Sequence, residues 1–234
     1  MEQQDAVELA YAEARRKFLP AFDADAKEPH QVYSASDIAG NDVWSRISRI
    51  TDACIHKDNV VEALTEKGVW HDSIVTVLRA IPLDSPSAKF RIKSSMLLNY
   101  LVTFQLNKRQ TLRGNPDFIA RDLDLPSDVT KRFLESFMTA VDGHGRMRRY
   151  TSSKQNKDKT LVHILLLYIM CQGSSMKIGS IKPIVDELQV GANDAANLLR
   201  EAGCRVQRVG NSFSAALQVP LTFPPPKRGG RAQS

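Results

Sequence analysis

The sequence KTLVHILLLYIMCQGSSMKIGSIKPIVDELQVGANDAANLLRE, residues 159–201, decides the fold of this chain. Its apolar run over 159–171 predicts a buried helix. Residues 181–188 predict a short helix, in which Pro183 is tolerated because it lies in the first turn. Residues 192–201 predict a further helix. Three helices in close succession, the middle one short, therefore form this part of the chain.

A β-hairpin is predicted after these helices. Residues 204–209 alternate apolar and polar side chains, which is typical of a strand, and residues 215–219 predict a second strand. Gly210-Asn211-Ser212 between them predicts a turn. Helix, short helix, helix and hairpin is the element order of a winged helix, so the sequence over 156–226 predicts one.

The preceding part of the chain shows the same order less completely. A long helix is predicted over 88–106, a short helix over 116–123, and a further helix from Pro126 through Val141. No obvious strand pair stands in the basic stretch 146–159 that follows, so the sequence does not show a wing there. The predicted fold class is mainly α with small β-hairpins, a tandem winged helix preceded by an extended arm.

These patterns divide the chain into four parts. We predict an extended acidic arm or linker over 1–42, a first winged helix with N-terminal helices over 43–155, a second winged helix over 156–226, and a disordered basic tail over 227–234. The arm opens with a predicted helix over 5–18. The rest of the arm has no periodicity, and two interpretations stand: a strap laid over a surface, or a disordered tail.

The charge of the chain is unevenly distributed. The formal net charge is +6, yet residues 1–42 hold nine acids and four bases. The rest of the chain holds 28 bases and 17 acids. A basic body favours a polyanionic partner, most often a nucleic acid. A basic surface without a specific partner is the alternative.

Basic side chains gather where the first wing would lie. A wing lies along phosphates, and cations there neutralise phosphate charge and release counterions. The predicted DNA contacts are Arg146, Arg148, Arg149, Lys154, Lys157 and Lys159, with Lys131 and Arg132 on the preceding helix. Residues 88–116 also carry six bases and no acid. A solvated basic loop, or a docking surface for an acidic protein, is the alternative. Helix 192–201 is nearly neutral, which favours a protein-contact role for the second unit.

Residue patterns of an enzyme are not visible. The five histidines are scattered, and the sequence has neither a Cys/His cluster with zinc spacing nor a phosphate-cradling loop. We therefore expect no catalytic residue, no cofactor and no metal. The longest strongly apolar run, 161–171, is shorter than the ~20 residues that a membrane span needs. We therefore expect no membrane partner.

Segments at both ends of the chain resemble a known family. Residues 14–23, ARRKFLPAFD, are similar to the linker of a subunit specific to RNA polymerase I. Residues 203–206, GCRV, and 215–224, AALQVPLTFP, are similar to the closing hairpin of the same family. This is the forty-nine-kilodalton subunit, or polymerase-associated factor, family. Its members join a TFIIF-like dimerisation module to a TFIIE-like tandem winged helix.

The resemblance implies a non-catalytic subunit of RNA polymerase I. Such a subunit binds DNA near the cleft, supports initiation and elongation of ribosomal RNA transcription, and is found in the nucleus and nucleolus. Its partners are DNA and other RNA polymerase I subunits. The dimerisation module is absent from this sequence, so the resemblance does not carry the small heterodimer partner subunit over to it. A winged-helix scaffold that binds only protein in a transcription complex is the alternative function.

Overall fold

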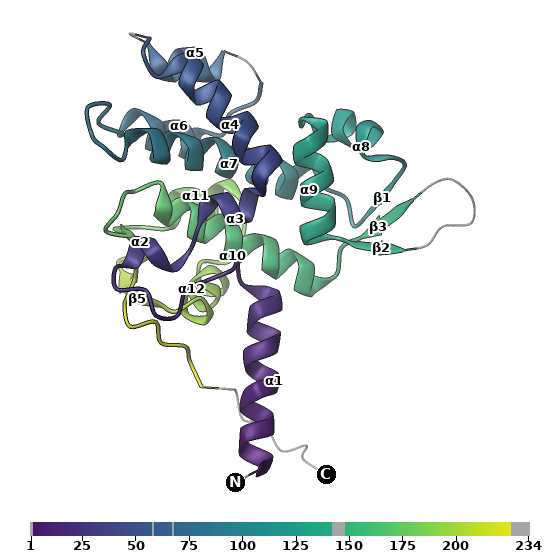
Figure 1. Ribbon diagram of the computed structural model, residues 1–234, viewed down its shortest axis with the longest axis vertical. Coiled ribbons are helices and arrows are strands. Elements are labelled where there is room, and N and C mark those ends of the chain that lie inside the picture. The colour runs from purple at the N-terminus through teal and green to yellow at the C-terminus, as the bar shows by residue number, and fades with distance from the viewer. Residues whose placement is uncertain (1, 58, 67, 142–147, 226–234) are drawn as a thin grey trace.

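The computed structural model describes residues 2–57, 59–66, 68–141 and 148–225. Helices dominate it, and its strands form two three-stranded antiparallel sheets (Figure 1). The predicted fold class, mainly α with small β-hairpins, is confirmed. The predicted tail over 227–234 lies outside the described residues, and the division into domains stays a prediction.

The C-terminal part has the element order that the sequence predicted, with one added strand. Its sheet has the order β4-β6-β5. Its elements are α10 (Lys154–Met170), β4 (Lys177–Ile178), α11 (Lys182–Glu187), α12 (Ala192–Glu201), β5 (Cys204–Val209) and β6 (Ser212–Leu217). Helix α10 begins earlier than predicted because the Ser153 hydroxyl accepts a hydrogen bond from the backbone N–H of Asn156, which caps the helix. Part of the basic stretch is therefore helical.

The middle of the chain repeats this order. Its sheet, β1-β3-β2, has the same arrangement. The elements are α7 (Ala88–Asn107), β1 (Thr111–Arg113), α8 (Pro116–Leu123), α9 (Ser127–Phe137), β2 (Thr139–Val141) and β3 (Arg149–Thr151). The prediction of one helix from Pro126 through Val141 was wrong, because Met138 has extended backbone and the next residues pair with β3. We call α7–β3 the first unit and α10–β6 the second.

Helices α7 and α10 pack along each other in the centre of the molecule. Each is buried around most of its circumference, which explains why neither shows a one-sided apolar stripe. An aromatic cluster joins them to α9, because the ring of Phe104 meets that of Phe133 at 5.4 Å and the ring of Phe137 meets His163 at 5.0 Å. The two units therefore share one core.

Three helices precede the first unit and pack near α7. They are α4 (Asn41–Cys54), α5 (Val60–Thr65) and α6 (Asp72–Arg79). Helix α4 buries Val43, Ile47, Thr51 and Cys54, which stand three or four residues apart and so share one face. This face lies against α7, whereas the charged face of α4 remains accessible.

The N-terminal arm contains α1 (Glu2–Phe18), α2 (Pro29–Val32) and α3 (Ala35–Ala39). Helix α1 projects from the body (Figure 1). The segment after α1 lies on the second unit, where the Tyr33 hydroxyl donates to the carbonyl oxygen of Ala202 at 2.9 Å. The ring of Phe22 lies 5.3 Å from that of Phe223, so the arm also contacts the end of the chain. Residues 19–40 thus form a strap with its own buried side chains, which include Val32 and Tyr33.

Candidate nucleic-acid interface

The first unit presents a polar, basic face on its sheet. Leu112 on β1 pairs with Tyr150 on β3, and both side chains are buried. Because side chains alternate across a strand, the residues on either side of this pair lie on the opposite face. One row of that face consists of Thr111, Thr151 and Thr139, and the next of Arg113, Arg149 and Val141. We call these two rows the wing face.

Arg113 and Arg149 stand directly opposite each other in this sheet, and both are exposed. Like charges in cross-strand pairs are destabilising. Among the described residues, the ion pairs involve other side chains, so no carboxylate offsets the two guanidinium charges. A bound anion between them would remove the repulsion, and a guanidinium group is the preferred partner of phosphate.

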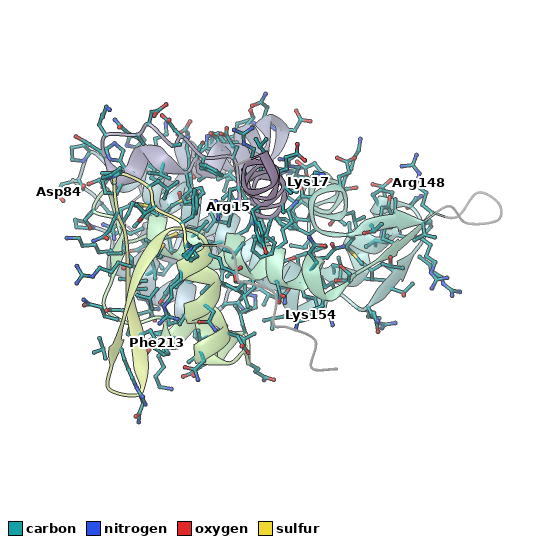
Figure 2. The ribbon with its side chains drawn as sticks, turned by 90° about the horizontal axis from the view of Figure 1, so that it is seen from below. Arg15, Lys17, Asp84, Arg148, Lys154 and Phe213 are labelled. Atoms are coloured by element: carbon teal, nitrogen blue, oxygen red, sulfur yellow. The ribbon has the colours of Figure 1, made fainter. Side chains whose placement is uncertain are left out.

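The start of α10 adjoins the wing face. The Asn156 side-chain amide donates to the Thr139 hydroxyl at 3.2 Å and so ties the first turn of the helix to β2. Lys154 and Lys157, three residues apart, share one exposed side of this turn. The positive end of the helix dipole lies here as well. Figure 2 shows Arg148 at the end of the sheet and Lys154 at the start of α10.

Lys108 stands behind this surface. Its ammonium group donates to the Thr160 hydroxyl at 2.9 Å and lies 5.0 Å from the centre of the Phe104 ring. Burial, and to a smaller extent the charge of Lys157, lowers the pKa of Lys108 to about 7. Lys108 is thus a buried amine behind the exposed lysines at the start of α10.

In the structure, only some of the predicted DNA-contact residues lie together on one exposed surface. Arg148, Arg149, Lys154 and Lys157 are exposed together on β3 and α10. Lys159 is half-buried over the ring of Phe137, and burial lowers its pKa. Arg146 lies outside the described residues. Arg113 was not predicted as a contact, although the acid-free stretch 88–116 was a signal for it.

Helix α9 carries the two remaining predicted contacts. Lys131 is exposed, but the guanidinium of Arg132 donates to the carbonyl oxygens of Asp37 at 3.0 Å and Ile38 at 3.4 Å. Arg46 of α4 pairs with Asp128 at the start of α9. The arm and α4 therefore cover much of the helix that would enter a major groove, and Arg132 is engaged within the chain.

The second unit lacks a comparable face. Arg205 pairs with Ala216 and Arg208 with Phe213, so the two arginines are not opposite each other and alternate to different faces. The guanidinium of Arg208 donates to the carbonyl oxygen of Gly210. The strap contacts this unit just after α12, where the Tyr33 hydroxyl donates to the carbonyl oxygen of Ala202, while Asn193 and Arg200 on the helix stay exposed.

The described residues show little that suggests catalysis. They contain no group of three or more His, Cys, Asp or Glu side chains that could hold a metal ion. His71 lies 3.2 Å from a carboxylate oxygen of Glu187 and 3.0 Å from the Thr103 hydroxyl, so both ring nitrogens join α6 and α7 to α11. In the part of the chain that the structure describes, no helix is long and apolar enough to cross a membrane.

Comparison with known proteins gives this geometry a context. The model of the A49-like RNA polymerase I associated factor family matches residues 1–224. The chain belongs to this family. As a family member it is also similar to the DNA-directed RNA polymerase I subunit rpa49 of Schizosaccharomyces pombe, with 23% identity over 241 residues. The match covers 95% of this chain and 54% of the relative, so the chain spans about half the length of the relative. The resemblance that the terminal segments indicated is confirmed.

Proposed function

We propose that this chain is a non-catalytic subunit of RNA polymerase I that binds DNA through the wing face and the start of α10. The directly opposed, exposed guanidinium groups of Arg113 and Arg149 carry this proposal, with Lys154 and Lys157 beside them. Membership of the A49-like family supports the assignment to RNA polymerase I. In this role the chain binds near the cleft, supports initiation and elongation of ribosomal RNA transcription, and resides in the nucleolus.

The proposed binding is to the DNA backbone. Arginine, lysine and threonine side chains contact phosphate oxygens, which fixes position without reading sequence. Base reading by a winged helix would need the helix before the wing to enter a groove, and α9 is covered by α4 and the arm. We therefore expect duplex or melted DNA to bind without strong sequence preference.

We further propose that both units are winged helices with different roles. Each has the order helix, strand, helix, helix, strand, strand, with the last strand in the centre of the sheet. The first unit has the cationic face, whereas the second contacts the strap and the end of the chain. The first unit would hold DNA, and the second would hold protein.

A salt titration tests the DNA-binding proposal. The affinity of the full chain for labelled duplex and single-stranded DNA should fall steeply as salt concentration rises. Arg149→Gln and Lys154→Gln should each weaken binding evenly across sequences and reduce the salt slope by ~1. Arg79→Gln, on an exposed position of α6 away from the wing face, is the control and should bind like the unchanged chain. Equal affinity of all four proteins would refute the proposal.

The alternative is a scaffold in which the wing face meets an acidic protein. The contacts that the arm and α4 make with α9 favour it, because they leave this helix less open to a groove. Excess unrelated DNA distinguishes the two functions. It should displace a protein partner from the wing face if the face binds DNA, and only weakly if the chain is a scaffold.

A further inference from the structure

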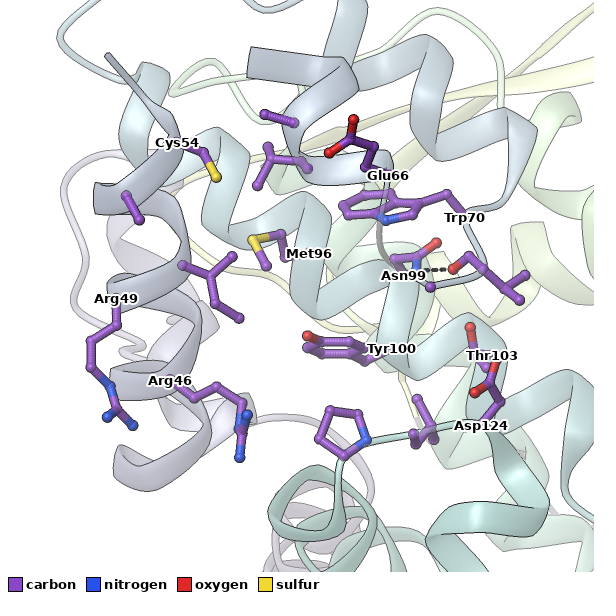
Figure 3. Close-up of a pocket in the computed structure, with 18 of the residues that line it drawn as sticks. Arg46, Arg49, Cys54, Glu66, Trp70, Met96, Asn99, Tyr100, Thr103 and Asp124 are labelled. Carbon is purple, nitrogen blue, oxygen red and sulfur yellow. Dashed lines mark hydrogen bonds between the residues drawn. The ribbon is translucent and has the colours of Figure 1, made fainter. Parts of the chain in front are cut away.

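A second surface, between the first unit and the helices that precede it, is hollowed and distinct from the wing face. A cavity of about 1050 Å³ lies open between α4, residues 63–66 and 68–70, α7 and residues 120–126 (Figure 3). This volume is at the upper limit of small-ligand sites. We call it the α7 groove, because Met96, Asn99, Tyr100 and Thr103 of that helix line it.

The floor of the α7 groove is aromatic and apolar. Figure 3 shows Tyr100 and Trp70 reaching into the space between its walls, with Met96 beside them. Both rings are half-buried, although the side chains around them are close-packed on the core side. Val69 at the rim is 57% exposed. Large apolar side chains left open in a hollow mark an interaction site more often than single exposed ones do.

The side-chain amide of Asn99, at the base of this groove, already has hydrogen-bond partners within the chain. The amide of Asn99 donates to the carbonyl oxygen of Val69 at 2.8 Å, and its oxygen accepts from the N–H of His71 at 3.1 Å. Asn99 therefore shapes the rim segment and is not available to a ligand. An occupant would be recognised by the aromatic floor and by charges on the walls.

The walls carry charges of both signs, with cations in the majority. Arg49 and Lys57 are exposed on α4 and its end, whereas Glu66 and Asp124 are exposed on the other walls, where Arg121 also lines the groove. Arg46, the third cation on the α4 side, is held by Asp128. Figure 3 shows Arg46 and Arg49 across the hollow from Glu66 and Asp124. A continuous phosphate backbone would be repelled by the two carboxylates, whereas a polypeptide can place one charge at each wall.

We propose that the α7 groove binds an extended polypeptide segment of another RNA polymerase I subunit. An aromatic or large aliphatic side chain of that segment packs on Tyr100 and Trp70, and a nearby acidic residue faces Arg49 and Lys57. Buried aromatic anchors with complementary charges at the rim are the usual basis of such recognition. The inference rests on the proposed place of this chain in the polymerase, and it does not depend on the wing face.

The first test measures binding of the full chain to RNA polymerase I from which this subunit has been removed. Arg49→Glu combined with Lys57→Glu should weaken that binding by about tenfold, because two attractive charges become repulsive. Arg49→Lys combined with Lys57→Arg should retain it, and Arg79→Glu on the exposed side of α6 is the matched control. Unchanged binding of the double charge reversal would overturn the proposal.

DNA binding of the same variants separates the two surfaces. The double charge reversal should retain the affinity of the unchanged chain for duplex DNA. A loss as large as that of the wing-face variants would show that the groove holds nucleic acid and would overturn the proposal. A different outcome is that the wing-face variants keep their DNA affinity while the groove variants bind the polymerase more weakly. That result would refute DNA binding by the wing face and would still support polypeptide binding by the α7 groove.

A photocrosslinking residue at Val69 provides a second measurement that does not alter the wall charges. In the assembled polymerase it should crosslink to a segment of another subunit with an acidic residue close to an aromatic or aliphatic one. Crosslinks to DNA, or none above those of a probe at Arg79, would contradict the inference.

Discussion

The two units of this protein have the same order of elements and differ in what their sheets present. In the first, Arg113 and Arg149 are opposite each other, whereas in the second the arginines of β5 face Ala216 and Phe213. The strands of the first wing are three residues long, and those of the second are six. The shared order of elements gives both units the same architecture. The register of the strands decides whether two arginine side chains lie opposite each other.

The units also differ in how the arm holds them. On the first, the Arg132 side chain donates to two carbonyl oxygens at the end of α3. On the second, the Tyr33 hydroxyl donates to the carbonyl oxygen of Ala202, just after α12. The same strap therefore contacts both units, and it leaves Arg113 and Arg149 of the wing face exposed.

The largest expected effect tests whether the units share one core. Phe133 and Leu199, one in each unit, are fully buried in one cluster. Phe133→Ala should lower the free energy of unfolding by about 3–5 kcal/mol and Leu199→Ala by about 2–5 kcal/mol. Because the core is continuous, urea unfolding followed by circular dichroism should show one transition in each variant.

Leu83→Ala, at a side chain that is 47% exposed, is the control for these core variants. It should change the free energy of unfolding by less than about 0.5 kcal/mol. Two separate transitions in the Leu199→Ala protein would show that the units unfold independently, and the shared core would then be ruled out.

An intermediate effect distinguishes the two wings. Arg113→Glu combined with Arg149→Glu should weaken DNA binding by about thirtyfold, because two phosphate contacts become repulsive. Arg205→Glu combined with Arg208→Glu makes the same charge change in the second unit, where we expect a loss of less than about threefold. Fluorescence anisotropy at two salt concentrations measures both. Equal losses would mean that net charge, and not the wing face, determines the affinity.

The smallest expected effect is a pH dependence that comes from Lys108 of the first unit. Burial lowers the pKa of Lys108 to about 7, so the folded state binds fewer protons than the unfolded state between pH 7 and the ordinary lysine range. The free energy of unfolding should therefore rise with pH across that window. Lys108→Met removes this contribution, so the variant should be stabilised most below pH 7, with the gain shrinking as pH rises.

Urea unfolding of both proteins at several pH values measures this difference. Lys154→Met, at an exposed lysine of the same surface, is the matched control and should show no such slope relative to the unchanged chain. A constant difference between Lys108→Met and the unchanged chain across the window would contradict the lowered pKa.

Much of the fold could be predicted because helices are local. The long apolar helices and the short helix over 116–123 follow from spacing along the chain, and the structure confirms them. The strands of the first wing could not be predicted in this way. They have three residues each, and β2 is exposed along its length, so neither carries an apolar alternation.

Part of the candidate site could be predicted because some of its residues are close together in the sequence. Arg148, Arg149, Lys154 and Lys157 form a cluster in the sequence, so composition was enough to indicate them. Arg113 joins them only through pairing of β1 with β3. Lys159 and Arg132 belong to the same sequence pattern, but they pack on an aromatic ring and on the arm.

By itself the sequence determined the succession of helices, the acidic arm before a basic body, and the resemblance to a polymerase subunit. These depend on residues close together in the chain, since helical periodicity and local charge need no distant contact. The tertiary structure decided which cations face one another, which are covered, and where the α7 groove opens. Strand register, the strap and the packing of α4 set these features, and each joins residues that are far apart in the sequence.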